Sequence, residues 1–357
     1  MSNVAKPKSD LSRAFSEDGA RKTHVGGQAL LEGVMMRGKY NWAVGVREPD
    51  GGVYEESHDL ASGRAKNGWM YWPCVRGCRA MVESLVLGYK ALEIAALHAF
   101  SEDEEDEAES AASEPSPKSD GDAVFGKKEM AFSMVLGLVM GVVLFIVAPA
   151  FITNLLVGEY DAHTLAWNIV DGILRVAVFV FYIWLIGRMS DIKRMFGYHG
   201  AEHKTIHCYE HGLPLTPENA RQFPRLHVRC GTAFLIMVMI IAILVYTVTP
   251  LNALILAWGV PDGAPKLALI IAARIALMPV IAGISYEITV RWAGSHPENP
   301  LVKVVLWPGM QMQYLTTNEP DDGMLECAIA AMQQVLEREE LEAAKTAAAA
   351  RGAQAQA

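Results

Sequence analysis

The sequence predicts a mainly α-helical, polytopic membrane protein with about four transmembrane helices, a small N-terminal β-hairpin unit and amphipathic cytoplasmic helices. Three observations support this fold class. Hydrophobic residues make up 52% of the chain. Two uncharged apolar runs, Met130–Gly158 and Cys230–Pro261, are each longer than the roughly 20 residues that a transmembrane helix needs. Basic residues gather in one internal loop, which is typical of the cytoplasmic side of membrane proteins.

The N-terminal region predicts a small β unit followed by an amphipathic helix. Residues 1–24 are polar and carry no apolar core of signal-peptide type, so we expect them to be disordered and cytoplasmic. Within residues 25–100, Asn41–Arg47 alternates in strand fashion, and turn residues connect it to a second strand that begins at Val53. In residues 73–100 apolar side chains recur at helical spacing between charged ones, which favours an amphipathic helix against the membrane surface over a span.

The acidic tract Ser101–Asp122 accounts for the net charge of the whole chain. It holds ten acidic residues and one lysine, and this difference of nine charges equals the formal net charge of −9. Such a composition cannot bury a core, so residues 101–125 are predicted to be a disordered linker. The sequence has no basic stripe with interleaved aromatic residues, so we expect no nucleic acid among the partners.

Four predicted spans form a membrane domain over residues 126–290. They lie near residues 130–154, 165–187, 232–255 and 266–286. Seven basic residues fall between the second and third spans, in residues 188–230, whereas the loop between the first and second spans has none. Because Lys and Arg concentrate in cytoplasmic loops, both termini and this His-rich loop are predicted to face the cytoplasm.

The C-terminal region, residues 291–342, is predicted to be cytoplasmic and partly helical. The apolar run Leu301–Tyr314 is short and interrupted by Pro308, so we expect it to lie at the membrane interface. Pro320, followed by two aspartates, is typical of a helix start. The helix that follows soon loses its apolar stripe, and residues 343–357 are predicted to be a disordered tail.

Charged residues inside the predicted spans are one set of candidate functional residues. Asp171 and Arg175 lie in the second span, and Arg274 lies in the fourth. A charge in hydrocarbon is costly and normally finds a partner. Counted from the outer ends of their spans, Asp171 and Arg274 lie at similar depth, so an ion pair between the two helices is predicted, with Arg175 as the local competitor one turn away.

The histidines form the second set, because five of the ten fall between His199 and His227. A spacing of four residues places His199 with His203, or His203 with His207, on one face of a helix, so either pair can offer two imidazoles to one metal ion. The four histidines His199, His203, His207 and His211 cannot all bind the same ion. His203 belongs to both pairs and is the central candidate, whereas His211 lies about 80° further round the helix.

The segment His199-Gly-Ala-Glu-His203 also fits the HxxEH pattern, in which two histidines bind zinc and the glutamate between them activates water. Glu202 is then the general base. His227 or Cys230 can complete a tetrahedral site, and Glu210 is the competing third ligand. The alternative without a metal is that these side chains suit a membrane interface and that Cys230 merely begins the apolar span.

Four blocks of the sequence carry a family resemblance. They are Gly26–Arg37 (GGQALLEGVMMR), Tyr198–Glu210 (YHGAEHKTIHCYE), His227–Phe234 (HVRCGTAF) and Leu315–Glu326 (LTTNEPDDGMLE). In these blocks the chain resembles the YqhQ-type family of uncharacterised bacterial multi-pass membrane proteins, which are often described as predicted metal-dependent enzymes. The resemblance implies a bacterial inner-membrane location but supplies no reaction. Val228 departs from the family, in which a proline usually follows the histidine.

The leading hypothesis is therefore a membrane protein whose cytoplasmic loop holds a divalent metal ion, zinc by its ligand chemistry, with hydrolysis as the candidate reaction. The predicted ligands are His199, His203, His207, His227 and Cys230. The alternative is a non-catalytic membrane scaffold or assembly factor, in which the Gly-rich N-terminal block and Asn318–Asp322 present a surface to other membrane proteins. A small transporter is less favoured, because four spans without an evident internal repeat leave little room for a substrate pathway between them.

Overall fold

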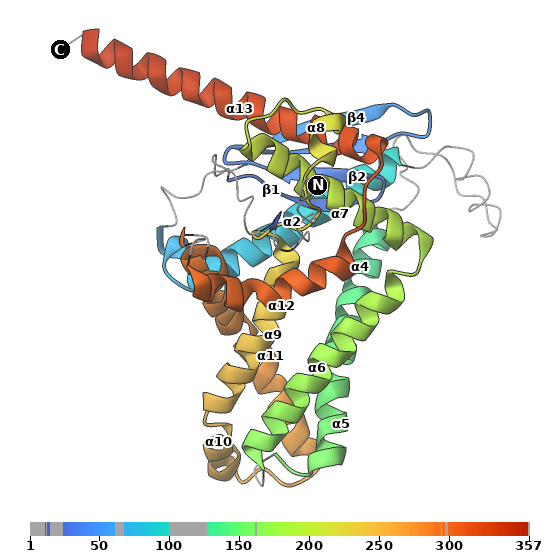
Figure 1. Ribbon diagram of the computed structural model, residues 1–357. Coiled ribbons are helices and arrows are strands. Elements are labelled where there is room, and N and C mark those ends of the chain that lie inside the picture. Colours follow the sequence, from blue (N-terminus) through green and yellow to red (C-terminus); the bar gives the residue numbers. More distant parts are fainter. Residues whose placement is uncertain are drawn as a thin grey trace, which may run out of the picture.

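The structure is a computed structural model, and it describes residues 11, 13–14, 24–60, 68–99, 127–160, 163–293, 295–296 and 299–355. In this part of the chain the architecture is mainly helical, with one small antiparallel sheet near the N-terminus. The sheet and its covering helices lie at one end, and the long apolar helices extend from it at the other (Figure 1). The predicted acidic linker and most of the predicted disordered N-terminus lie outside the described residues.

The sheet has four strands in the order of the sequence: β1 (Gly26–Leu30), β2 (Gly33–Arg37), β3 (Asn41–Arg47) and β4 (Val53–Asp59). Each strand pairs antiparallel with the next. The predicted hairpin corresponds to β3 and β4, whereas β1 and β2 were not predicted. The reason is that four of the five residues of β2 are buried, so its sequence does not alternate between apolar and polar residues.

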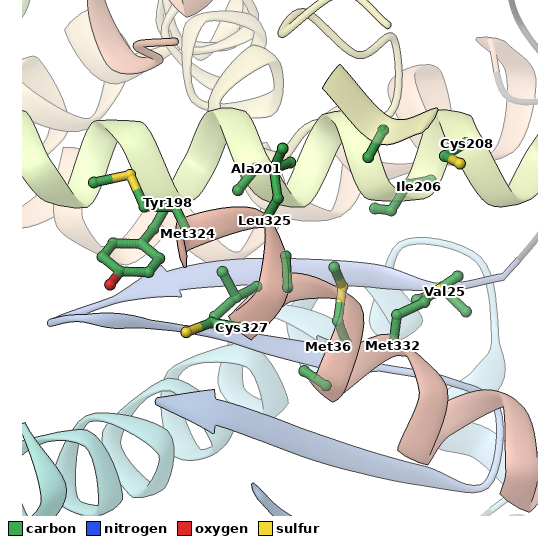
Figure 2. Packing of buried hydrophobic residues seen from close by; sticks show 14 of the residues in the cluster. Val25, Met36, Tyr198, Ala201, Ile206, Cys208, Met324, Leu325, Cys327 and Met332 are labelled. Atoms are coloured by element: carbon green, nitrogen blue, oxygen red, sulfur yellow. The ribbon is translucent and has the colours of Figure 1, made fainter. Parts of the chain in front are cut away.

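Each face of the sheet packs on helices. On one face Met35 and Val44 form a core with Leu87 and Ala91 of α2 (Val75–His98), the helix predicted from the amphipathic pattern. The opposite face packs on α7 (Ser190–Glu210) and α13 (Asp322–Ala355), and Figure 2 shows this core between the helices and the strands. The sheet is therefore a central layer with helices on both sides.

A glycine allows α13 to approach the sheet closely. A Cβ atom at Gly45 of β3 would lie 2.3 Å from the carbonyl oxygen of Cys327 on α13. Because that oxygen belongs to the backbone, the helix could not give way by a side-chain rotation. The central strand and the C-terminal helix are thus in direct backbone contact.

The helix α2 also joins the sheet to the apolar helices. The short helix η1 (Gly68–Tyr71) precedes it, and Arg76 in its first turn forms an ion pair with Glu287. A Cβ atom at Gly283 would lie 2.7 Å from the Cys74 carbonyl oxygen, so the start of α2 touches the end of α11. The sheet and the apolar helices are therefore packed together.

Three helical stretches among the described residues are long and apolar enough to span a membrane: Val135–Val157, Thr164–Ile186 and Ala264–Ala293. The first combines α4 (Lys127–Val142), the π-helical η2 (Val143–Val147) and α5 (Ala148–Val157). The second is α6 (Thr164–Ile186). The third is α11 (Ala264–Tyr286) with the π-helical η3 (Glu287–Ala293). They correspond to the first, second and fourth predicted spans.

The third predicted span, residues 232–255, is not one helix. It divides into α9 (Gly231–Val248) and α10 (Leu251–Trp258), because Pro250 between them has no N–H to continue the ladder. Its longest apolar helical part, Phe234–Val248, is shorter than the other three stretches. The helix lengths thus support three spans. The fourth predicted span, over residues 232–255, stays a prediction.

The C-terminal region also differs from its sequence-based expectation. α12 (Pro300–Thr316) continues through Pro308, and it crosses between the sheet and the apolar helices (Figure 1). α13 continues as a helix to Ala355, where a disordered tail from residue 343 was expected. Alanine has the highest helix propensity, and the alanine-rich end of the chain prolongs the helix after its apolar stripe has ended.

Candidate metal centre

The histidine-bearing face of α7 packs against the loop that leads into α9. This loop follows the short helix α8 (Pro217–Arg221), and Lys204 ties it to α7 by donating to the Phe223 carbonyl oxygen at 2.7 Å. The ring centroids of His203 and His227 are 5.6 Å apart, and those of His207 and His227 are 4.6 Å apart. The structure therefore brings the two histidine-containing segments of the sequence together.

The first group of candidate ligands consists of His199, His203 and Cys230. Each offers one ligand atom, and these atoms lie within 4.8 Å of one another. The Nε2 atom of His199 is 3.2 Å from Sγ of Cys230. Nδ1 of His199 lies 2.8 Å from the carbonyl oxygen of Thr316, and Nδ1 of His203 lies 2.6 Å from that of Arg225.

These contacts set the tautomer of both rings. A carbonyl oxygen only accepts hydrogen bonds, so each Nδ1 carries the proton and each Nε2 presents its lone pair. Nε2 of His203 is buried and has no hydrogen-bond partner within the described residues. Histidines that bind metals characteristically donate from the second nitrogen in this way, which orients the ring.

The thiol of Cys230 is also placed for metal binding. Cys230 is the N-cap of α9, and its Sγ accepts from the Thr232 N–H at 3.4 Å. A cysteine binds a metal ion through its deprotonated sulfur. Two imidazoles and one thiolate suit zinc, and three protein ligands leave the fourth tetrahedral position open.

The second group consists of His207, Glu210 and His227, all buried, whose ligand atoms also lie within 4.8 Å of one another. Nε2 of His207 lies 3.0 Å from the Leu226 carbonyl oxygen. Glu210 forms an ion pair with Arg229, whose Nη2 atom is 3.5 Å from Nε2 of His227. The Arg229 guanidinium therefore lies beside this group, and its positive charge balances the negative charge of the Glu210 carboxylate.

The two histidines of the second group are neutral at physiological pH. Burial lowers the pKa of His207 to about 4. Burial, with the nearby Arg229 guanidinium, holds the pKa of His227 well below its usual value. The His227 backbone is clamped by Gln313, whose side chain accepts from its N–H at 2.8 Å and donates to its carbonyl oxygen at 2.9 Å. This group has the features of a structural polar network.

Glu202, the predicted general base, belongs to neither group. It is buried against β1, where it accepts a hydrogen bond from the Gly27 N–H. Burial raises the pKa of this carboxyl to about 7. A Cβ atom at Gly27 would lie 2.8 Å from the Glu202 carboxyl carbon, so the glycine makes room for the carboxylate.

The structure therefore divides the predicted ligand set. His199, His203 and Cys230 come together, whereas His207 and His227 meet Glu210 one helical turn further along α7. His211 is exposed and is in neither group. No local pattern indicates the backbone carbonyl groups that orient the rings, and Gln313 stands out only as a polar residue in an apolar run.

The charged residues of the second and fourth predicted spans form a buried cluster between α6 and α11. Asp171 accepts from Nε of Arg175 at 2.8 Å and also from Arg274, which donates to Asn168 Oδ1 at 2.6 Å. The predicted ion pair between the two helices is thus present, together with its local competitor. Two aromatic rings flank the Arg274 guanidinium carbon, with centroids at 4.5 and 4.4 Å: those of Trp167 and Tyr246.

Comparisons with known proteins give one family. The family described as "Protein of unknown function (DUF1385)" matches residues 72–338. The uncharacterized protein YqhQ of Bacillus subtilis is 31% identical over 320 residues, which cover 88% of this chain and 93% of that protein. No solved structure matches the chain.

Proposed function

The chain belongs to the DUF1385 family of proteins of unknown function, and from this premise we propose that it is a multi-pass membrane protein that binds a zinc ion at His199, His203 and Cys230. The observation that carries the proposal is the convergence of Nε2 of His203 and Nε2 of His199 on the Cys230 thiol, while both Nδ1 atoms face backbone carbonyl oxygens. The buried Nε2 atom of His203 has no hydrogen-bond partner within the described residues, and a metal ion would supply the missing partner.

The proposed topology has four spans in a bacterial inner membrane, with both termini and α7 in the cytoplasm. α9 has 18 residues, or about 27 Å at 1.5 Å per residue, close to the ~30 Å hydrocarbon core. Together with α10 it is long enough to cross as a helix broken at Pro250. The basic residues between Arg188 and Arg229 support the orientation.

The proposed chemistry is hydrolysis. A zinc ion held by His199, His203 and Cys230 would supply an activated water, because three protein ligands would leave one coordination position open. The carboxyl of Glu202 lies against β1 and interacts electrostatically with His199 of the proposed site. It remains the candidate general base for water at the metal, not a ligand. Glu202→Gln is expected to leave the zinc content unchanged and to abolish turnover.

The scaffold alternative has less support. Parts of the two blocks take part in internal packing: Gly27 lies against Glu202, and a Cβ atom at Gly200 of α7 would lie 2.1 Å from the Asn318 carbonyl oxygen. The remaining surface of the blocks, at Gly26, Glu319, Asp321 and Asp322, is exposed. Val34 and Met36 of the first block are fully buried. These residues are more simply explained as supports for the histidine-bearing helix.

Elemental analysis tests the proposal. The protein is purified in detergent, washed with a chelator, reloaded with zinc and freed of excess metal. We expect about one zinc ion per chain in the wild type and loss of most of it in His203→Ala, because removal of one of three ligands lowers affinity by orders of magnitude. His211→Ala is the matched control, since it removes an imidazole from the same helix outside the group. Equal zinc content in His203→Ala and the wild type would refute the proposed site.

A further inference from the structure

An apolar groove of about 720 Å³ runs along α6 in the membrane region. Its lining residues are glycine or apolar. From α6 they include residues spaced one turn apart, and α9 and α12 complete the walls: Gly172, Val176, Val180, Trp184, Ile243 and Leu315. At the end of the groove formed by Gly172, α6 and α9 meet closely, because a Cβ atom at Gly172 would lie 2.4 Å from Cδ1 of Ile243. The groove therefore begins at this crossing and continues toward the end of the molecule that carries α7.

The groove has the length and the surroundings of a lipid chain site. From Gly172 to Trp184 the helix rises about 18 Å at 1.5 Å per residue, comparable with one leaflet of a ~30 Å hydrocarbon core. The walls remain open to the side, since Ile173 and Phe181 are 62% and 60% exposed. In a bilayer, an apolar groove of this kind is filled by hydrocarbon.

The upper end of the groove adjoins the candidate zinc centre. Leu315 lines the groove, and the next residue, Thr316, presents its carbonyl oxygen to Nδ1 of His199 at 2.8 Å. One peptide bond and one hydrogen bond thus separate the groove wall from a candidate ligand. A molecule whose chain lies in the groove would place its head group on the side of the membrane that carries the metal centre.

The same end carries positive charge. The guanidinium carbon of Arg188 lies 4.1 Å from the ring centroid of Trp184, a groove residue. In the part of the chain that the structure describes, the Arg188 side chain is exposed and has no carboxylate partner. A stacked, uncompensated guanidinium at the membrane surface suits the phosphate of a lipid head group.

From this arrangement we infer that the groove binds one acyl chain of an anionic phospholipid and that phospholipids are the substrate class of the zinc centre. The inference of substrate class rests on the proposed function. The binding of the lipid itself depends only on the groove and Arg188.

The test uses the full chain in lipid nanodiscs that contain phosphatidylglycerol with a photoactivatable diazirine in one acyl chain. Crosslinked peptides are mapped by mass spectrometry. We expect crosslinks to concentrate on the α6 groove residues and to fall at least about fivefold in Val176→Trp, which fills the groove with an apolar side chain. Ile169→Trp is the matched control, because Ile169 is a lipid-exposed α6 residue outside the groove and its crosslinking should match the wild type.

Two further arms separate the head group and the metal. Phosphatidylcholine with the same diazirine chain should crosslink less than phosphatidylglycerol in the wild type but equally in Arg188→Gln. Zinc content should be unchanged in Val176→Trp. If the wild type holds no zinc but labels in the groove, the proposed zinc function and the assignment of substrate class fail while the lipid site stands. Labelling spread evenly over all lipid-facing helices, labelling unchanged by Val176→Trp, or crosslinked dimers that show a second copy in the groove would overturn the lipid site.

Discussion

Nε2 of His199 lies 3.2 Å from Sγ of Cys230, although 31 residues separate the two in sequence. His199 belongs to α7, whose neighbours are the sheet and α13, whereas Cys230 caps the apolar helix α9. A metal ion held by both residues would link the sheet end of the molecule to its membrane end. The chemical state of Cys230 is therefore a sensitive reporter of metal binding.

The first prediction concerns alkylation of Cys230. After chelator treatment at pH 7.5, a small maleimide should modify Cys230, and zinc should slow that reaction on the order of tenfold, because a coordinated thiolate is no longer a free nucleophile. Peptide mass spectrometry gives the rate for each cysteine.

The other cysteines are internal controls for this measurement. Cys74 is exposed and should react equally fast with and without zinc. Burial raises the pKa of Cys208 and of Cys327 to about 11, so both thiols carry little thiolate and should react slowly in either state. A Cys230 rate that zinc does not change would count against its role as a ligand.

The second prediction tests the close contact between α7 and the chain that precedes α13. Gly200→Ala should destabilise the protein by about 1–3 kcal/mol, because the new Cβ atom would lie 2.1 Å from the Asn318 carbonyl oxygen and a backbone atom cannot rotate away. Thermal unfolding in detergent measures the loss. Since Thr316 and its contact to His199 lie close by, the variant should also bind zinc more weakly.

Gly137→Ala is the control for Gly200→Ala. A Cβ atom there meets nothing within 4 Å, and alanine is the better helix former, so stability should be unchanged or slightly higher. If Gly200→Ala behaved in the same way, the packing of α7 against residue 318 would be looser than the structure has it.

The third prediction concerns the buried charges. Asp171→Ala should cost more stability than Arg274→Ala, because it leaves two arginines facing each other without a carboxylate, whereas Asp171 keeps Arg175 when Arg274 is removed. The double variant should be about 1–3 kcal/mol more stable than the sum of the single losses predicts. Unfolding by SDS in mixed micelles gives the four free energies, and strict additivity would mean that the pair does not interact.

The fourth prediction concerns orientation in the membrane. In a cysteine-free background, a probe at Glu159 should react with an impermeant maleimide added to intact spheroplasts, and a probe at Glu218 should react only after lysis. The reason is the concentration of basic residues between Arg188 and Arg229, against none in the loop that contains Glu159. The reverse pattern would move the histidines to the other compartment.

The long helices could be predicted from the sequence because each has a strong local signal. The apolar stretches near residues 130–154, 165–187 and 266–286 predict the three span-length helices, and the 3.6-residue period predicts α2. β2 was missed because helices bury both of its faces, which removes the alternation that marks a half-buried strand. The split of the third span at Pro250 depended on one residue whose effect on a long apolar run is decided by packing.

The candidate site could be predicted in its members but not in its grouping. The spacing of four residues placed His199 beside His203, and that pair is adjacent in the structure. Which loop residue joins which pair depends on the path of the chain from Phe223 to Cys230, which no local pattern specifies. The position of Arg229 beside Glu210 is also a tertiary contact, and it distinguishes the second group from the first.

The contact between Gly45 and Cys327 has a consequence for how the protein is made. The strands emerge from the ribosome before the helices that pack on them, and α13 follows all the long apolar helices. Until then α13 does not cover the sheet surface around Val34 and Ala43, and α7 lacks its packing contact with α13. The helix that bears the histidine cluster is therefore fully covered only after α13 has been made, and a nascent chain halted before residue 322 would expose this surface to chaperones and proteases.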